Sequence, residues 1–281
     1  SELTSMPGAY WQAFTFGPER TDSAVGTDFL GKRARTDEAN AQEYPYLTCE
    51  LGGGMMTSYH RRIHIDPRDA FALEIAKVGS GSNLPGFYMY HGGTNPDSLV
   101  PGVTLQETQS TQMTNYNDMP VKTYDFQAPL GEFGQIRESY HLLRRTHLFL
   151  RDWQATLAPM PASFPDTRIT KTDATDLRFA VRSDGHSGFI FINNYQRGLD
   201  MPAKQNVQFR LTPFGLDSTI SIPPTIVPET PITVPANTAF FLPFNMDLNG
   251  ATLVSASAQP VCNVTDGKTT TVVFVEIPGI P

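Results

Sequence analysis

The pattern of the sequence changes near residue 160, and this change limits the folds that the chain can adopt. Up to about residue 155, short strand-like runs alternate with helical segments, which is typical of a parallel α/β fold. Beyond the Pro-Met-Pro segment at residues 159–161, short β-prone runs are separated by Pro, Gly, Asn and Asp, which predicts an antiparallel sandwich or barrel. We therefore expect an α/β domain over residues 1–160 and an antiparallel β domain over residues 161–281.

The first half contains two strand-like runs with a predicted helix between them. Residues 46–49 are β-prone, residues 87–90 form a second apolar run, and glycines follow each run. The segment 67–78 has apolar residues at helical spacing, Asp66 can cap its N-terminus, and Gly79 can end it. We expect this unit to place the two strands side by side and parallel, with the helix as the crossover.

Further elements are predicted from the same signals. Residues 133–153 carry apolar and aromatic side chains at three-to-four spacing, which indicates a long amphipathic helix. The second half contains short β-rich runs that we interpret as strands, at residues 177–181, 189–193, 207–211, 219–222, 240–244, 252–255 and 272–275.

The composition excludes several classes of partner. The chain has 28 acidic and 21 basic residues, a net charge of −7 and a pI near 5.3. It lacks the basic stripe that neutralises a phosphate backbone, so we expect no nucleic acid partner. No apolar run approaches the roughly 20 residues of a membrane-spanning helix, so we expect no membrane partner. Cys49 and Cys262 are too few for a disulfide framework, and we interpret both as free thiols. His60 and His64 lack a third ligand, so we expect no metal.

Glu50 ends the first strand-like run and precedes three glycines. Enzymes built on (β/α) barrels hold their catalytic groups at the C-terminal ends of strands, so this carboxylate is a candidate catalytic residue. The glycines leave its surroundings free of bulky side chains, so a ligand can approach closely. The alternative is that Glu50 caps a helix or pairs with Arg61 or Arg62, and its position alone does not decide between these interpretations.

The second strand-like run leads into the segment YMYHGGTN at residues 88–95, which combines aromatic rings with polar side chains. Sugars suit such a lining, because aromatic rings cover their C–H faces while amides and carboxylates bind their hydroxyl groups. Tyr88, His91 and Asn95 are therefore candidate substrate-binding residues. The alternatives are that the tyrosines belong to the core and that His91 is a structural histidine.

A third segment, YDFQAPL at residues 124–130, places an acid between two aromatic residues in a predicted loop. Taken together and in order, the segment TCE that ends at Glu50, the segment FYMYHGGTN at residues 87–95 and this loop resemble the glycoside hydrolase family 35 β-galactosidases. The match covers roughly residues 44–150. The β-rich remainder resembles that family only in being an all-β appendage.

The resemblance implies a retaining, exo-acting enzyme on a (β/α)8 barrel. Such an enzyme removes terminal β-galactosyl or related residues from oligo- or polysaccharides, needs no cofactor, and is periplasmic or secreted. The family's nucleophile at the end of strand seven falls on Glu50, and its sugar-binding tyrosine on strand eight falls on Tyr88. Tyr124 and Asp125 match the loop that closes the site over the carbohydrate, although Phe126 stands where the family often has a second tyrosine.

One part of the family's site has no counterpart in this sequence. A retaining glycosidase needs two carboxyl groups about 5 Å apart, one as nucleophile and one as acid/base. The family's acid/base glutamate follows an asparagine, and no Asn-Glu pair occurs in these 281 residues. We therefore expect the chain to be the C-terminal portion of a barrel followed by the β domain, with the N-terminal part of the same barrel as its partner, and inactive alone. The alternative is a non-catalytic carbohydrate-binding or pseudoenzyme module.

Overall fold

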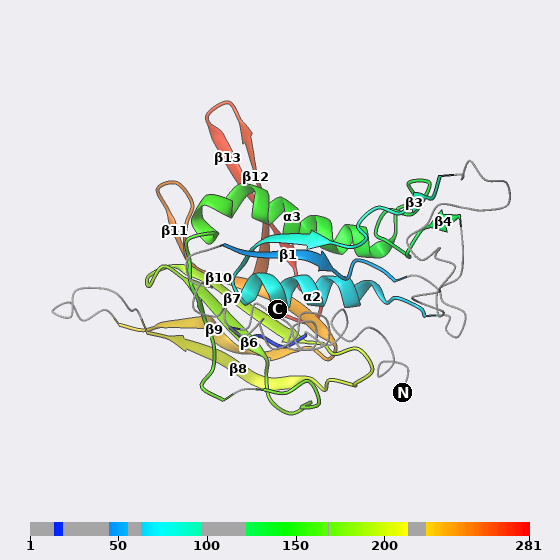
Figure 1. Cartoon of the computed structure of the whole chain (residues 1–281). Coiled ribbons are helices and arrows are strands. Elements are labelled where there is room, and N and C mark those ends of the chain that lie inside the picture. The colour runs from blue at the N-terminus through cyan, green and yellow to red at the C-terminus, as the bar shows by residue number, and fades with distance from the viewer. Residues whose placement is uncertain (1–13, 19–44, 56–62, 97–121, 168, 213–222) are drawn as a thin grey trace.

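The computed structural model describes residues 14–18, 45–55, 63–96, 122–167, 169–212 and 223–281. Figure 1 shows the arrangement of the helices and strands. The helices in these ranges are α2 (Pro67–Gly79) and α3 (Glu138–Leu157). The strands are β1 (Tyr46–Leu51), β2 (Ser82–Phe87), β3 (Gly93–Thr94), β4 (Thr123–Tyr124), β5 (Ala162–Ser163), β6 (Phe179–Ser183), β7 (Gly188–Asn194), β8 (Lys204–Leu211), β9 (Thr225–Val234), β10 (Thr238–Asp247), β11 (Thr252–Ser255), β12 (Ala258–Asp266) and β13 (Thr269–Glu276).

The strands β1 and β2 pair in parallel and are connected through α2, as the sequence predicts. Leu51, the last residue of β1, lies opposite Phe87, the last residue of β2. The two strands therefore end at the same edge of a two-stranded sheet, which brings together the segments that follow them. The described residues form no closed barrel, so this unit is one parallel pair with its crossover helix.

The helix α2 begins where its sequence signals place it. The side chain of Asp66 caps it by accepting a hydrogen bond from the backbone N–H of Arg68 at 2.9 Å. In return, the carboxylate of Asp69 accepts a hydrogen bond from the backbone N–H of Asp66 at 3.0 Å, which completes a capping box. The helix extends one residue beyond the predicted segment, because Gly79 is itself helical, and the glycine with a positive φ of +104° after the helix end is Gly81.

Two predicted boundaries in the first half are wrong. The strand expected at residues 87–90 lies earlier, because β2 ends at Phe87 and the following tyrosines form a turn. β2 contains a proline and a glycine, which are depleted in strands, so pairing with β1 rather than local propensity makes this segment extended. The helix expected over residues 133–153 runs from Glu138 to Leu157, because Gly134 has a φ of +81° and Arg137, the N-cap, has an extended backbone.

The second half is antiparallel, as predicted. Its main sheet has the order β11-β10-β7-β6-β5, and every neighbouring pair in it is antiparallel. The pairs β8-β9 and β12-β13 are antiparallel hairpins outside this sheet. Sequence reasoning missed β9 and β12, which contain prolines. The strand expected at residues 219–222 lies outside the described residues.

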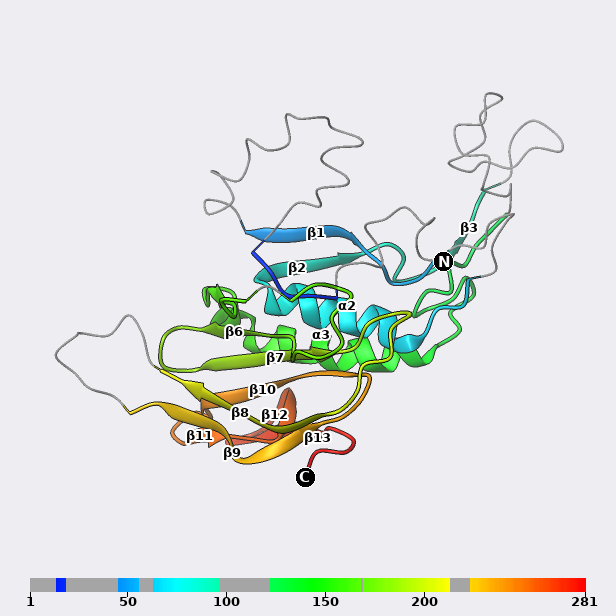
Figure 2. The ribbon, with the colours of Figure 1, turned by 90° about the horizontal axis from the view of Figure 1, so that it is seen from below.

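The helices lie between the parallel pair and the main sheet, as Figure 2 shows. Alternate residues of the central strands face opposite sides, so the sheet carries apolar side chains on both faces. One face packs against α2 and α3 through Phe71, Ile75, Phe149, Trp153, Phe189, Phe191 and Phe241. The other face packs against β8 and β9 through Ile190, Ile192, Phe209, Val227, Val234, Phe240 and Leu242. The α/β unit and the β-sheets thus share a core, and their division into two domains at residue 160 stays a prediction.

A buried arginine fixes the junction between the two halves. Arg182 on β6 is 1% exposed, and its guanidinium donates hydrogen bonds to the carbonyl oxygens of Val78 at 3.2 Å and Leu157 at 2.8 Å. These carbonyls belong to the last turns of α2 and α3, where a cation is favourable because backbone carbonyls there lack helical partners. Burial lowers the pKa of Arg182 to about 10. The arginine remains a cation near neutral pH and anchors both helix ends to the sheet.

Two further findings bear on the sequence predictions. No helix in the described ranges is long and apolar enough to cross a membrane. Cys262 is a free, half-buried thiol, as predicted. The side chain of Cys49 lies outside the described part of the structure.

Candidate active site

Three sequence segments converge beyond the C-terminal ends of β1 and β2. The backbone N–H of Tyr88 donates a hydrogen bond to the carbonyl of Leu51 at 3.0 Å, and the N–H of Met55 donates one to the carbonyl of Phe126 at 2.6 Å. The N–H of Leu130 donates to the carbonyl of Tyr90 at 3.0 Å. The segments around Glu50, Tyr88 and Tyr124 are therefore held together by backbone hydrogen bonds, although they are far apart in the sequence.

The glycines after Glu50 serve this convergence and do not leave open space. A Cβ atom on Gly53 would lie 2.2 Å from the carbonyl oxygen of Met89, and one on Gly54 would lie 2.1 Å from that of Phe126. Both glycines are buried. The interpretation that they let a ligand approach is therefore wrong for these two residues. They allow the loop after β1 to pack against the two other segments.

An aromatic cluster occupies the meeting point. The ring of Tyr88 lies edge-on to the rings of Tyr124 and Phe126, with centroid distances of 6.2 and 5.5 Å, and the latter two rings are 4.4 Å apart. The hydroxyl groups of Tyr88 and Tyr124 are in contact. All three side chains are half-buried, so they combine apolar faces with two polar tips at the ends of the strands.

Asp125 uses its carboxylate to fix the loop that bears these aromatic residues. Its Oδ1 accepts a hydrogen bond from the N–H of Glu132 at 2.8 Å, and its Oδ2 accepts bonds from the N–H of Gln127 at 3.1 Å and from Arg137 at 2.7 Å. Burial acts to raise the pKa of Asp125, but these hydrogen bonds and the charge of Arg137 outweigh it, so the pKa is lowered. The carboxylate is ionised and holds the backbone on both sides of Phe126.

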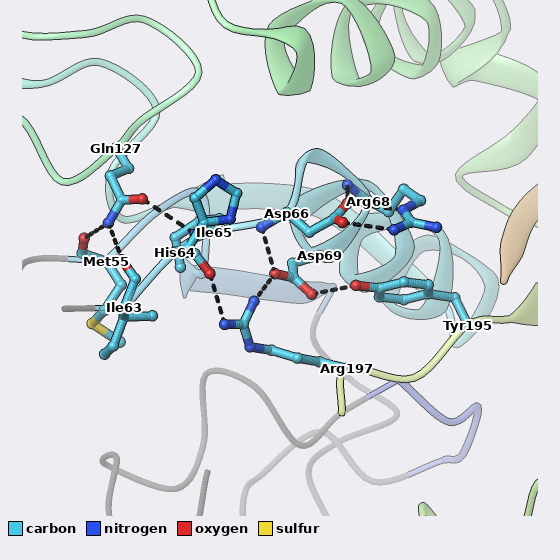
Figure 3. A network of polar contacts seen from close by, with 10 residues as sticks. All are labelled: Met55, Ile63, His64, Ile65, Asp66, Arg68, Asp69, Gln127, Tyr195 and Arg197. Carbon is cyan, nitrogen blue, oxygen red and sulfur yellow. Dashed lines mark hydrogen bonds and ion pairs between the residues drawn. The ribbon is translucent and has the colours of Figure 1, made fainter. Parts of the chain in front are cut away.

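Gln127 connects this loop to the segment before α2. Its amide nitrogen donates to the carbonyl of Ile63 at 2.7 Å and of Met55 at 3.3 Å, and its amide oxygen accepts from the N–H of Ile65 at 3.2 Å. Figure 3 shows these bonds beside the capping box of α2. Phe126 and Gln127 both have a positive φ, of 55° and 53°, a conformation that non-glycine residues adopt only where surrounding contacts impose it.

His91 and Asn95 lie in the strand-end segment, beside a short antiparallel ribbon. His91 is exposed, and its Nδ1 contacts the carbonyl oxygen of Gly92. The backbone N–H of Asn95 donates a hydrogen bond to the carbonyl of Lys122 at 2.7 Å, next to the β3-β4 pair. Glu132 joins the two strands of the ribbon, because its carboxylate contacts the hydroxyl groups of Thr94 on β3 and Thr123 on β4.

Glu50 is the penultimate residue of β1, and its side chain is exposed at the edge where both parallel strands end. Its position relative to Tyr88 agrees with the predicted strand geometry, and a direct contact between its carboxylate and the hydroxyl of Tyr88 stays a prediction. The alternative partners Arg61 and Arg62 lie outside the described residues, as does His60.

Comparison with known proteins adds to this geometry. Residues 11–150 match the family model of glycosyl hydrolases family 35. The resemblance inferred from the three motifs is thereby confirmed. A curated relative, "Beta-galactosidase 6" of Oryza sativa subsp. japonica, is 24% identical over 127 residues, which cover 44% of this chain and 13% of the relative. The chain thus matches only a small part of the length of that relative.

Sequence reasoning missed two clusters of buried polar side chains near the candidate active site. Asp69 is fully buried, and its carboxylate accepts a hydrogen bond from the hydroxyl of Tyr195 at 2.6 Å and pairs with Arg197 (Figure 3). Arg197 also donates to the carbonyl of His64 at 2.7 Å. Tyr195 and Arg197 belong to the β-rich half, so the sequence of α2 does not predict them as partners. From that sequence alone, Asp69 is an ordinary acidic residue of the first helical turn.

Glu74 and His147 form the second group. They join α2 to α3, with the carboxylate Oε1 2.9 Å from Nε2 of the imidazole. The ring of His147 lies 5.7 Å from that of Phe87 and 5.4 Å from that of Tyr90. Burial raises the pKa of Tyr90 to about 12, together with the nearby Tyr140 and Glu74. This group therefore lies directly against the end of β2 that leads into the family 35 motif. The position of Glu74 in the sequence of α2 does not indicate that its side chain is buried.

Proposed function

We propose that this chain carries the nucleophile side of a glycoside hydrolase active site that acts on β-galactosides, with Glu50 as the nucleophile. The observation that carries the proposal is the convergence of three family 35 motif segments at the C-terminal ends of two parallel strands. That edge is where (β/α) barrel enzymes hold their catalytic groups. The half-buried aromatic cluster beside it offers ring faces and hydroxyl groups suited to a sugar.

The reaction proposed is hydrolysis with retention of anomeric configuration. A carboxylate oxygen of Glu50 attacks the anomeric carbon, and the glycosidic oxygen leaves with a proton from an acid/base carboxyl group. Water then attacks the glycosyl ester and loses a proton to the same group, which frees Glu50 and releases the sugar. No cofactor takes part. The match to family 35 supports the proposal that the sugars removed are terminal galactosyl residues.

Different residues contribute to this site in different ways. Tyr88 and Tyr124 would face the sugar through their hydroxyl groups, and His91 and Asn95 would bind hydroxyls at its outer side. Asp125 is proposed to act through its loop, because both of its carboxylate oxygens already accept hydrogen bonds from the protein. It would place Tyr124 without needing to touch substrate.

The acid/base group would come from outside these 281 residues. The sequence contains no Asn-Glu pair, the pattern in which the family holds this glutamate. We expect the remaining barrel strands to supply it and to cover the side chains of Leu47 and Leu84, which are 55% and 60% exposed on β1 and β2. Carbohydrate and this barrel portion are therefore the proposed partners.

Covalent labelling tests the nucleophile without needing the acid. A fluorogalactoside with a dinitrophenolate leaving group reacts without protonation of that group, and its fluorine slows hydrolysis of the glycosyl ester. Incubation of the chain with this reagent should increase the mass of the peptide that contains Glu50, as measured by mass spectrometry after digestion. Glu50→Gln should abolish the label, whereas Glu229→Gln, an exposed glutamate on β9, should leave it unchanged.

The alternative function is a carbohydrate-binding module without catalysis. The absence of the Asn-Glu pair favours it. This function predicts that the chain binds galactosides but takes up no label, and that the longer protein hydrolyses aryl β-galactosides equally well with Glu50 or Gln at residue 50. Label on another carboxylate would refute the assignment of Glu50 while keeping the hydrolase.

A further inference from the structure

A cavity of about 310 Å³ lies where α3 meets the β-rich half, between the end of α3, the start of β7, the end of β10 and the β12-β13 hairpin. None of the candidate active-site residues lines it. Its volume is at the lower end of the range for small-molecule sites, which suits a ligand of about one sugar ring. The site is separate in sequence and in space from the ends of β1 and β2.

The cavity has an apolar floor and a polar rim. The floor contains the buried side chains of Trp153, Phe189 and Met246. The rim is formed by side chains that carry carboxylate, amide and hydroxyl groups, namely Asp152, Thr156, Asp247, Asn249 and Asn263. This is the arrangement that sugars require, because their ring carbons pack on an apolar surface while their hydroxyl groups find both donors and acceptors.

The charge of the lining narrows the class of ligand. Among the described lining residues there are two aspartates and no lysine, arginine or histidine, and Arg151 pairs with Asp152 at 2.6 Å. This pairing leaves Asp247 as the negative charge of the lining, which disfavours a phosphate, sulfate or uronate. The hydrogen bond from Arg151 lowers the pKa of Asp152, which keeps this carboxylate ionised. Asp152 is also fixed in place, because its Oδ2 accepts a hydrogen bond from the backbone N–H of Asn263 at 2.7 Å.

A metal ion is not favoured by the same lining. Within the described residues there is no group of three or more His, Cys, Asp or Glu side chains that could hold one. The carboxylates that line the cavity can instead accept hydrogen bonds from hydroxyl groups of a ligand. The side-chain amides of Asn249 and Asn263 supply N–H donors for hydroxyl oxygens. The chemistry therefore matches a neutral polyhydroxylated ring.

We propose that this cavity binds one neutral hexose unit of a glycan, as a second carbohydrate site that does not depend on catalysis at Glu50. The ring lies over the floor near Trp153, with its hydroxyl groups on Asp247 and Asn263 at the rim. The site lies where α3 meets the β-rich half, with Asn263 and Val272 of the β12-β13 hairpin in its lining. It would keep a glycan on the protein while the chain end is processed at the other site.

Trp153 provides a direct reporter of occupancy. The chain has two tryptophans, Trp11 and Trp153, so Trp11→Phe leaves the cavity residue as the sole indole. Glu50→Gln is added to prevent turnover. In this double variant of the full 281-residue chain, titration with D-galactose and with D-glucose should change the tryptophan emission in a saturable way with at least one of the two sugars. D-galacturonate should bind at least tenfold more weakly, because the rim is anionic.

Rim variants separate this site from the candidate active site. Asp247→Asn removes a charged acceptor and should weaken binding roughly tenfold. Thr156→Phe fills the cavity mouth and should abolish the emission change, whereas Ala155→Phe, at the neighbouring exposed helix position that does not line the cavity, should leave it intact. Far-ultraviolet circular dichroism and the thermal midpoint check that both phenylalanine variants fold.

Three results would overturn the proposal. The first is the absence of any saturable change with either neutral hexose. The second is a change that survives Thr156→Phe but disappears in Tyr88→Ala, which would assign the binding to the ends of β1 and β2. The third is galacturonate binding as tightly as the neutral sugars, which would contradict the class of ligand. Loss of the fluorogalactoside label at Glu50 would by contrast leave this second site unaffected.

Discussion

The hydroxyl groups of Tyr88 and Tyr124 are in contact, although 36 positions separate the two residues in the sequence. Tyr88 follows the end of β2, and Tyr124 ends the short strand β4. Their rings meet edge-on at an interplanar angle of 82°. The contact therefore sets where the loop after β4 lies relative to the end of the parallel pair, at the edge that also carries Glu50.

Removing either hydroxyl should remove this link while keeping the ring packing. We expect Tyr88→Phe and Tyr124→Phe each to lower the free energy of unfolding by about 1 kcal/mol, the usual net value of one hydrogen bond. The double variant should cost less than the sum of the two, because the second change removes a hydroxyl that has already lost its partner. Urea denaturation measures the three values, and strict additivity would show that the contact carries no energy.

The glycines of the loop after β1 give a second prediction. Gly54→Ala should destabilise the chain by about 1–3 kcal/mol or more, because the added Cβ would lie 2.1 Å from the backbone oxygen of Phe126 and the backbone must move. Gly93→Ala is the matched control, since a Cβ there meets nothing within 4 Å. The thermal midpoints of both variants test this. Equal effects of the two changes would mean that the close packing around Gly54 is not essential.

The pair between Asp125 and Arg137 gives a third prediction. Arg137→Met should release both the carboxylate of Asp125 and the carbonyl of Ala128, which Arg137 contacts at 2.7 and 2.6 Å. Because both partners are partly exposed, we expect a loss of about 1 kcal/mol after solvent screening.

The pH dependence of that loss has a definite sign. The pKa of Asp125 is lower in the folded chain than in the unfolded chain, so its contribution is present above the ordinary value of 3.8 and is lost as the pH falls through the folded value. Wild type and Arg137→Met should therefore differ near neutral pH and approach each other in acid. A difference that stays constant down to the acid transition would contradict the electrostatic origin.

The sequence was sufficient to predict the parallel pair and its helix because local and tertiary signals agree there. Asp66 and Pro67 mark the start of α2 by their own chemistry, and the βαβ order then requires parallel strands. β2 was misplaced because its extended conformation comes from pairing with β1 and not from its own residues. Prolines hid β9 and β12 in the same way, since edge positions and a bulge tolerate them.

In the candidate site too, some features could be predicted from the sequence and others could not. The motif residues could be named from the sequence, because aromatic and acidic side chains after strand-like runs are a local pattern. The roles of Asp125, Gln127 and Arg137 could not, since they depend on which backbone groups the fold places beside them. For the same reason, the prediction that Gly53 and Gly54 leave room for a ligand was wrong. Only the close approach of Met89 and Phe126 reveals why residues 53 and 54 lack side chains.

The buried pair of Glu74 and His147 gives the last prediction, which concerns stability and pH. Burial raises the pKa of Glu74. For His147, burial acts to lower the pKa, but the hydrogen bond and the charge of Glu74 outweigh it and raise the pKa. Both groups thus bind protons more tightly in the folded chain than in the unfolded chain. Neighbouring Tyr90 stays neutral through this range, because its pKa is about 12.

Groups with raised pKa values in the folded state stabilise it at low pH. The contribution of His147 is complete below its ordinary value of 6.5 and is lost as the pH rises through the folded value. In the unfolded chain, Glu74 loses its proton above the ordinary pKa of 4.5, whereas in the folded chain it still holds the proton. The folded state is therefore destabilised relative to the unfolded state as the pH rises. The contribution of this pair to the free energy of unfolding should therefore fall as the pH rises above the ordinary value of 4.5 of the carboxyl group.

Glu74→Gln should flatten this part of the stability curve, because the amide cannot ionise and no longer raises the pKa of His147. Glu138→Gln, which changes an exposed glutamate at the start of α3, should leave the slope as in wild type. Thermal midpoints in matched ionic strength at half-unit pH steps measure the slope. A wild-type midpoint that rises from pH 5 to pH 8, or an identical slope in Glu74→Gln, would show that the pair does not titrate with folding. Because His147 packs on Phe87 and Tyr90, a confirmed slope would also mean that the end of β2, which leads to Tyr88, is held most firmly in mildly acidic solution.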